Sequence, residues 1–75
     1  MENKIKQIMA AVFETEIENI TDDASSDTID NWDSLRLINL VAAIEEEFDI
    51  EFEEEEIIEM LNFKLISLLV AEKLK

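Results

Sequence analysis

Ser34, in the run Asp33-Ser34-Leu35, is the side chain whose surroundings best suit covalent chemistry. No histidine or lysine stands beside it to act as a base, so we do not expect a catalytic serine. At the first position of a helix, its hydroxyl would lie beside free backbone N–H groups and the positive end of the helix dipole, where a phosphate ester is stabilised. A simpler interpretation is that Asp33 and Ser34 only cap the helix.

The composition excludes most other chemistry. The chain has no cysteine and no histidine, which removes thiolate sites, the commonest general base and the commonest metal ligand. A calcium loop over residues 22–33 would need a glycine for its sharp turn, and the oxygen ligands fall at the wrong places. Paired carboxylates on so small a protein would lack the cleft that raises a pKa. We therefore expect neither an enzyme nor a metal site.

The net charge of the chain limits the classes of partner that it can bind. Twenty acidic residues against six basic ones give a formal net charge of -14. Such a surface repels phosphate backbones and anionic lipid, so we expect no nucleic-acid partner and no membrane partner. Basic protein surfaces, in contrast, are attracted to it.

The length and hydrophobic content indicate one small folded domain. A chain of 75 residues with 48% hydrophobic residues can build a single modest core, so we expect one domain over residues 1–75. Residues 1–11 carry alternating charge and no continuous apolar stretch, which indicates neither a signal peptide nor a membrane anchor. We expect a cytoplasmic monomer.

The spacing of apolar residues predicts four helices, over residues 2–14, 33 or 34 to 48, 54–61 and 65–75. The first carries a one-sided stripe formed by Ile5, Ile8, Met9, Val12 and Phe13. The third has acids in its first turn and the fourth has Lys73 and Lys75 at its end, as the helix dipole favours. With no credible strand, the fold class is all-α: a small four-helix bundle with a long first loop and a short third helix.

Two connections need apolar tethers. Residues 15–32 are mostly polar and acidic and form the long first loop, which we expect to be tied to the core by Ile17, Ile20, Ile29 and Trp32. Residues 49–53 alternate apolar and acidic side chains as a strand would. Five residues without a pairing partner cannot make a sheet, so this segment is also predicted to be a tethered loop.

The stretch over residues 33–48, DSLRLINLVAAIEEEF, resembles the attachment helix of acyl carrier proteins along its whole length. In that family Asp-Ser-Leu opens the second helix, and apolar residues follow at the places of Ile38, Leu40 and Ile44. An acidic cluster and then a phenylalanine close the helix. The helix order, the long first loop, the serine near mid-chain and the total length are also similar, so the resemblance covers essentially the full chain.

The resemblance implies that a phosphopantetheinyl transferase attaches a 4'-phosphopantetheine arm to Ser34. The thiol of the arm would then carry an acyl or aminoacyl group as a thioester, for a fatty acid, polyketide or specialised biosynthetic pathway. Asp33 matches the acid that helps to present the serine to the transferase, and Leu35 matches the apolar residue that contacts partner enzymes. The chain would catalyse no reaction itself.

Two residues beside the serine depart from the common pattern of this family. Arg36 stands where many fatty-acid carriers have an acid, and Asn39 replaces a frequent glutamate. The start of this helix is therefore less negative, so a basic patch on a partner would find its acids lower down, at Glu45, Glu46 and Glu47.

Two further departures precede the motif. Trp32 occupies a place where a small residue is common in this family. A tryptophan at that place resembles stand-alone carriers of specialised pathways. Asn31 occupies a place where glycine is frequent, and asparagine suits that place if the backbone is left-handed there.

These matches and departures predict the surface that contacts partner enzymes. Its residues are Leu35, Arg36, Ile38, Asn39, Glu45, Glu46, Glu47 and Met60. Acidic runs are often only solvated helix faces, but in a carrier they would steer the chain toward basic enzyme surfaces. The rival hypothesis is an acidic helical adaptor or nucleic-acid mimic that binds a basic protein, with Ser34 as a cap only.

Three bulky side chains leave one question open. Trp32, Met60 and Phe63 could line a pocket for an acyl chain, but such residues in small bundles are more often plain core. Both interpretations stand at this point.

Overall fold

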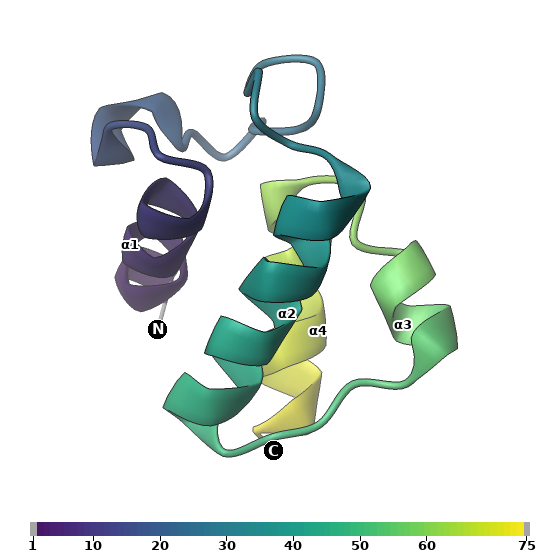
Figure 1. Cartoon of the computed structure of the whole chain (residues 1–75). Coiled ribbons are helices and arrows are strands. Elements are labelled where there is room, and N and C mark those ends of the chain that lie inside the picture. Colours follow the sequence, from purple (N-terminus) through teal and green to yellow (C-terminus); the bar gives the residue numbers. More distant parts are fainter. Residues whose placement is uncertain (1, 75) are drawn as a thin grey trace.

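The computed structural model describes residues 2–74 and shows four α-helices with one short 3-10 helix (Figure 1). The elements are α1 (Glu2–Val12), η1 (Ile17–Asn19), α2 (Ser34–Phe48), α3 (Glu54–Ile58) and α4 (Phe63–Lys73). Between residues 2 and 74 the only β-type pairing is an isolated bridge that joins Ser25 to Asn62. The prediction of an all-α four-helix bundle with a long first loop and a short third helix is confirmed.

One apolar core joins every part of the fold. Helix α1 contributes Ile5 and Met9, which lie one helical turn apart, and Phe13 follows the end of the helix on the same side. The remaining buried apolar residues come from the first loop, from α2, from the segment before α4 and from α4 itself, namely Ile20, Ala24, Ile29, Leu40, Val41, Ile44, Met60, Phe63, Ile66, Leu69 and Val70. Ile50 and Phe52 pack against this core, so the expected tethered loop between α2 and α3 is present.

The long first loop is ordered by its apolar side chains and by one backbone contact. Ile20 and Ile29 are buried, as predicted, and Trp32 packs against the core. The Phe63 N–H donates to the carbonyl of Ala24 at 2.9 Å, which fastens the loop to the start of α4. The prediction for Ile17 is wrong: its side chain is 39% exposed, because η1 turns it outward and Ile20 takes the buried place.

The chain closes two helices without any glycine. The residues after α1 and α2 that turn left-handed are Glu14, with φ of 54°, and Asp49, with φ of 56°. This conformation usually favours glycine, because a Cβ atom crowds the following carbonyl. Both helix ends therefore carry local strain that the packed core has to hold.

The last two helices differ in extent from their predicted ranges. Helix α3 ends at Ile58 instead of Leu61, because the Glu59 and Met60 N–H groups bond three residues back and tighten the final turn. Helix α4 begins at Phe63, two residues early, because the Asn62 side chain accepts the Leu65 N–H at 2.9 Å and caps it. Lys75, expected at the end of α4, lies outside the described residues.

Across residues 2–74, no helix combines the length and the apolar character that crossing a bilayer requires. The longest, α2, has 15 residues and ends in three glutamates and a phenylalanine.

We predict that Leu40→Ala lowers the free energy of unfolding by about 3 kcal/mol, because Leu40 is fully buried and the change leaves a cavity. Leu68→Ala is the matched control: Leu68 is 56% exposed, and its loss is expected to cost less than about 1 kcal/mol. Urea unfolding followed by circular dichroism measures both. Equal losses in the two variants would contradict the core described above.

Candidate functional site

The start of α2 presents Ser34 to solvent. Asp33 caps the helix: its side chain accepts the Arg36 N–H at 2.8 Å, and its carbonyl accepts the Leu37 N–H at 2.9 Å. Ser34 is the first helical residue and is exposed, so its hydroxyl lies beside the free N–H groups of the first turn. The capping role that the sequence offered as the simpler interpretation belongs to Asp33, and it leaves the Ser34 hydroxyl available.

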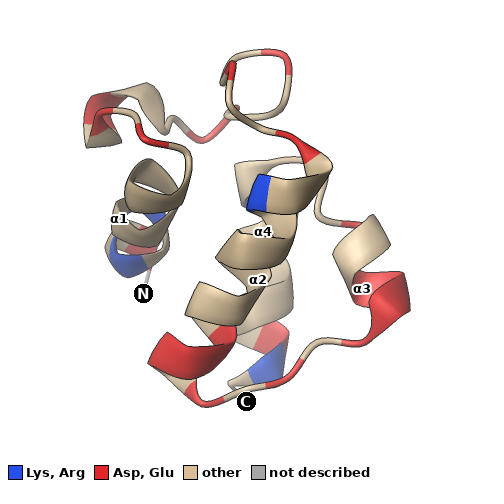
Figure 2. Ribbon diagram, in the orientation of Figure 1, with Lys and Arg blue, Asp and Glu red and all other residues tan. Residues whose placement is uncertain are grey.

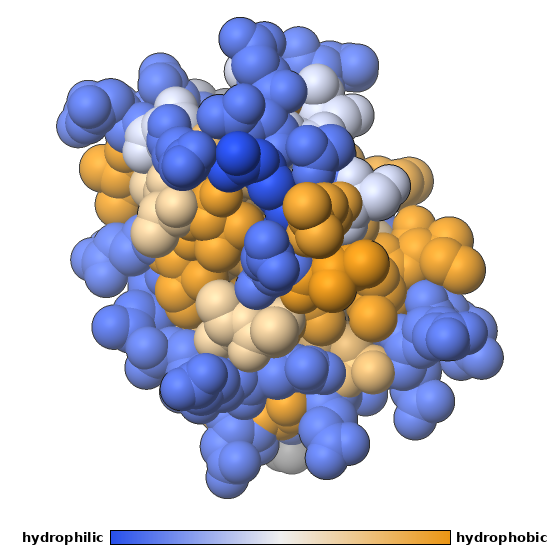
Figure 3. Space-filling view, in the orientation of Figure 1, coloured by the Kyte–Doolittle hydropathy of each residue, from blue (hydrophilic) through white to orange (hydrophobic). Residues whose placement is uncertain are grey.

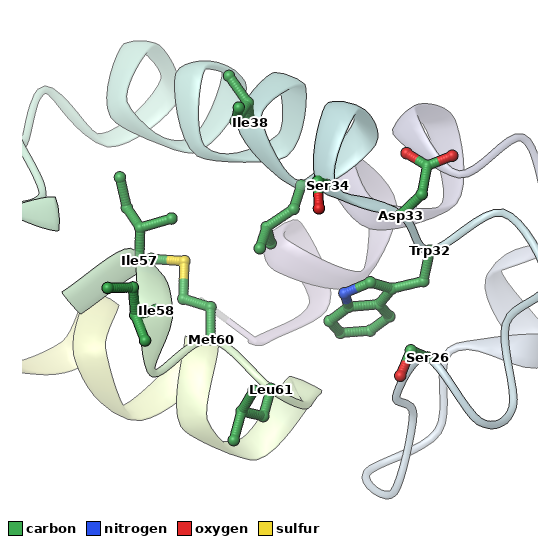
Figure 4. Close-up of a pocket in the computed structure, with 10 residues that line it drawn as sticks. Ser26, Trp32, Asp33, Ser34, Ile38, Ile57, Ile58, Met60 and Leu61 are labelled. Carbon is green, nitrogen blue, oxygen red and sulfur yellow. The ribbon is translucent and has the colours of Figure 1, made fainter. Parts of the chain in front are cut away.

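An apolar cleft of about 390 Å³ opens beside this serine (Figure 4). Its walls come from the first loop, from the start of α2 and from the segment around α3, with the lining residues Ser26, Trp32, Asp33, Ser34, Leu37, Ile38, Ile57, Ile58, Met60 and Leu61. In the close-up, Ser34 lies at the rim, and the side chains of Trp32 and Met60 flank the space in front of it. Apart from Ser26, Asp33 and Ser34, the lining is apolar.

Of the three bulky side chains that could line a pocket or belong to the core, two line the cleft and one lies in the core only. Trp32 and Met60 line the cleft, whereas Phe63 does not and is fully packed in the core, with 1% of its side chain exposed. Trp32 also stacks on Phe13, with ring centroids 4.9 Å apart and ring planes 17° from parallel. Trp32 is therefore both a wall of the cleft and part of the support of the loop before Ser34.

Exposed apolar side chains lie on the walls of the cleft and next to Ser34. Leu35 and Ile38 of α2 are 69% and 60% exposed, and Ile58 and Leu61 on the opposite wall are 74% and 66% exposed. Figure 3 shows an apolar surface on this face of the molecule. The sequence predicted the first two as contact residues and missed the second two. The only signal for Ile58 and Leu61 was that residues 57–61 hold more apolar side chains than one face of a short helix can bury.

Of the predicted partner-contacting residues, Met60 is buried and Arg36 is bound to the end of α1. Met60 is 1% exposed, so its side chain offers almost no surface to a partner. The Arg36 guanidinium reaches back to α1, where Nη1 donates to the Val12 carbonyl at 3.0 Å and lies 3.2 Å from Glu14 Oε2. The prediction that Met60 contacts a partner is wrong, because its side chain is packed inside the molecule. Arg36 keeps 30% of its side chain exposed, so its contact with a partner stays a prediction.

Asn31 does not have the backbone that a glycine at its position would suggest. Positive φ values between residues 2 and 74 occur only at Glu14 and Asp49, so Asn31 is not left-handed. Its side chain instead donates from Nδ2 to the Phe13 carbonyl at 2.8 Å. The side-chain amide, which donates this hydrogen bond, accounts for an asparagine at position 31.

The acidic run at the end of α2 is only partly free. Glu45 Oε2 accepts the Phe52 N–H at 2.8 Å and so holds the loop to α3, and Glu47 lies 3.6 Å from Lys4 Nζ. Glu46 is exposed and lies with Glu47 on the side of α2 that borders α1. Figure 2 shows the acids gathered at the lower end of α2, a basic position near its start and an uncharged section between them. The run is thus separated from the serine along the helix.

An ion pair ties α3, one wall of the cleft, to α4. Lys73 Nζ lies 2.8 Å from Glu56 Oε1, and that same oxygen accepts the Glu53 N–H at 2.7 Å. The hydrogen bond from the Glu53 backbone lowers the pKa of the Glu56 carboxyl, and the contact with Lys73 lowers it further. The pKa of Lys73 is raised, chiefly by its hydrogen bond to Glu56. Charged Glu56 is therefore the form that fastens α3.

The residues at the start of α2 fit a phosphate ester on Ser34. The hydroxyl is exposed at the positive end of the α2 dipole, and the apolar cleft offers a surface for whatever extends from it. Among residues 2–74 no group of three or more acidic side chains is placed to hold a metal ion. The exposed hydroxyl and the apolar cleft together suit a covalent arm on the serine.

Comparisons with known proteins agree with this geometry. The family model described as "Phosphopantetheine attachment site" matches residues 3–70. The acyl carrier protein of Buchnera aphidicola subsp. Schizaphis graminum (strain Sg) is 42% identical over 56 residues, which cover 75% of this chain and 71% of that protein. The solution structure of the holo acyl carrier protein from Geobacter metallireducens aligns with a TM-score of 0.86 at 30% identity, over 97% of this chain and 84% of that one.

The fold, the exposed serine and these matches define a phosphopantetheine-binding carrier domain. The chain belongs to the acyl carrier protein family. It is a carrier and not a catalyst, and its cofactor is a covalently attached 4'-phosphopantetheine. When bound, this cofactor supplies the terminal thiol that carries acyl groups as thioesters, which a chain without cysteine lacks.

We predict that the stabilising effect of Glu56 is lost in acid. Its folded-state pKa lies below the ordinary value of 4.5, so its contribution is complete above that pH and is lost as the pH falls through the lowered pKa. Urea unfolding of wild type and Glu56→Gln, from neutral pH down to about pH 3, should show the stability difference shrinking toward zero. Glu55→Gln removes the same charge one residue earlier, from an exposed side chain, and serves as the control. A difference that grows in acid would contradict the assignment.

Proposed function

We propose that Ser34 is the residue that carries the phosphopantetheine arm and that the chain delivers acyl groups on this arm to the enzymes of a biosynthetic pathway. The observation that carries the proposal is the position of Ser34: it is exposed, it is the first residue of α2, and it lies at the rim of an apolar cleft. Ser26, the other serine of the cleft, lies in a turn of the first loop and has no helix dipole behind it.

The modification reaction needs an enzyme partner, a phosphopantetheinyl transferase. The Ser34 oxygen forms a new bond to the phosphorus that carries pantetheine in coenzyme A. The bond from that phosphorus to the departing adenosine bisphosphate breaks, and the hydroxyl proton passes to a base. The chain has no histidine, and the Asp33 carboxylate beside Ser34 already accepts the Arg36 N–H as the cap of α2, so we assign the base to the transferase. Asp33 and the first turn of α2 hold the serine in place for this transfer.

The cleft supports a cargo with an apolar chain. Its walls would remove methylene groups from water beside the attachment point, at about 25 cal/mol for each Å² of apolar surface buried. A polar aminoacyl group would gain little from such walls. We therefore place the carrier in the synthesis of a fatty acid, a polyketide or a specialised acyl product, with fatty or other apolar acyl groups as its cargo.

The partner surface of this proposal has two parts. The apolar part consists of Ile38, Ile58 and Leu61, which line the cleft, and of Leu35, which follows Ser34 in α2. All four are exposed. The second part continues along α2 through Asn39 to Glu46, which share one helical face with Leu35 and are also exposed. Partner enzymes with a basic edge would contact Glu46 and place an apolar patch over the serine. Glu47 lies on the surface beside Lys4, which offsets part of its negative charge.

The rival hypothesis of an acidic adaptor or nucleic-acid mimic rests on charge alone. It gives no role to the exposed serine, to the cleft or to the apolar rim, and the family match covers most of the chain. The carrier proposal uses all of these features, and it keeps the acidic surface as the means by which partners are attracted. We propose further that the chain acts as a monomer in the cytoplasm.

We predict that the apo protein, incubated with coenzyme A, Mg²⁺ and a phosphopantetheinyl transferase, gains the mass of one phosphopantetheine. Ser34→Ala should gain nothing, because the accepting oxygen is absent. Ser26→Ala, a matched change in the same cleft, should gain as much as wild type. Mass spectrometry of the intact protein measures all three. The proposal would be contradicted if Ser34→Ala were modified, or if the wild-type protein were not.

We predict that Ile58→Gln weakens recognition by the transferase or by an acyl-transfer enzyme without weakening the fold. Ile58 is 74% exposed beside the cleft, so the change removes apolar contact area only from the partner interface, and KM should rise several-fold. Leu68→Gln is the control, since Leu68 is also exposed but lies outside the cleft lining. Steady-state kinetics and melting curves separate the effects. An unchanged KM for Ile58→Gln would remove this residue from the surface.

A further inference from the structure

The C-terminus of α1 is closed in part by its own backbone. The Thr15 N–H donates to the carbonyl of Ala10 at 3.0 Å, and the Glu14 N–H donates to that of Ala11 at 3.4 Å. With Glu14 left-handed, these two bonds form the closing motif typical of helix ends. The motif leaves the last carbonyls of the helix, those of Val12 and the residue after it, to be satisfied by other donors.

Side chains near the start of α2 supply these donors. Asn31 Nδ2 donates to the Phe13 carbonyl at 2.8 Å, and Arg36 Nη1 donates to the Val12 carbonyl at 3.0 Å. The guanidinium also pairs with Glu14 Oε2 at 3.2 Å, and its side chain is 30% exposed. These two donors come from either side of the attachment serine. The first turn of α2 is therefore fixed to the end of α1 by contacts that span 18 and 24 residues of sequence.

We propose that Arg36 is a positioning residue for the modification of Ser34. It acts through what we name the Arg36 clamp, the contact of its guanidinium with the Val12 carbonyl and the Glu14 carboxylate. This inference rests on the proposed attachment at Ser34. Arginine suits the role because its guanidinium is always charged, and the two N–H groups of Nη1 can donate to the Val12 carbonyl and the Glu14 carboxylate together.

The clamp acts on the conformation that the transferase meets. Arg36 donates its backbone N–H to the Asp33 cap and its guanidinium to α1, so one residue links the cap of α2 to the end of α1. Without the clamp, the turn that carries Ser34 samples other arrangements. A transferase that binds only the clamped arrangement then shows a higher KM, in proportion to the lost population, while kcat for the bound form is retained.

Transferase kinetics on five variants of the apo chain test this role. Arg36→Met should raise KM about tenfold if the clamped form falls to about a tenth of the population. Arg36→Lys should recover part of the loss. Glu14→Gln keeps the arginine but weakens the clamp, so it should raise KM in the same direction, and the double variant should show less than the sum of the two effects. Glu18→Gln removes an equal charge from the neighbouring η1 and should match wild type.

The outcomes separate three roles for Arg36. If the arginine instead contacts the transferase, Glu14→Gln frees it, so KM stays unchanged or falls and the clamp is overturned. If Arg36 only stabilises the fold, the melting temperature falls but KM at a temperature well below it does not change, which also overturns the clamp. A shared rise in KM with retained kcat supports the clamp.

A second measurement reads the clamp without the transferase. Trp32 is the only tryptophan in the chain, and it stacks on Phe13 at the end of α1. Loosening the clamp should make Trp32 fluorescence easier to quench with acrylamide in Arg36→Met and Glu14→Gln, but not in Glu18→Gln. Equal quenching in all variants would overturn the inference. If Ser34→Ala were modified, the proposed attachment site would fail, while the quenching result would still decide whether the clamp exists.

Discussion

The structure depends on the burial of Phe13, where α1 ends. Its ring is fully buried and stacks on Trp32, so the end of α1 and the loop before α2 must meet at one point in the core. The same meeting brings the last carbonyls of α1 within reach of Asn31 and Arg36. A five-residue α3 and a polar first loop could not fix the start of α2 by themselves. The placement of Ser34 therefore follows from packing between segments that lie far apart in the sequence.

The parts of this arrangement that depend on local spacing could be predicted from the sequence. The apolar period marked the helices, and the Asp33-Ser34 pair marked the start of α2, because a cap needs only a short polar side chain beside free N–H groups. The direction of Arg36 could not be predicted in this way. A long side chain reaches about as far as a neighbouring helix, so its contacts depend on the tertiary fold. Periodicity also assigns Ile58 to a face without saying whether another element covers that face, and here nothing in residues 2–74 does.

The charge of the chain is arranged to leave the site apolar. Four cations pair with acids elsewhere, including Arg36 with Glu14 and Lys73 with Glu56, and the acids of α2 gather at its far end. The middle of α2 is neutral, and its exposed residues are Ile38, Asn39 and Ala42. Different parts of the surface therefore serve two roles. The net charge of -14 attracts partners over long range, and the exposed apolar residues Leu35, Ile38, Ile58 and Leu61 contact them at short range. A partner can be attracted by one and selected by the other.

The wall of the cleft formed by α3 is held differently from the wall formed by α2. A helix of five residues has no stability of its own, so α3 relies on the partly buried Ile57, on Met60 beyond its end and on the contact of Glu56 with Lys73. Helix α2 has 15 residues and three fully or nearly buried apolar side chains. Local opening in small proteins follows the elements with the fewest buried contacts. A cleft bounded by one firm wall and one lightly held wall can widen for an apolar chain without disturbing the helix start that presents Ser34.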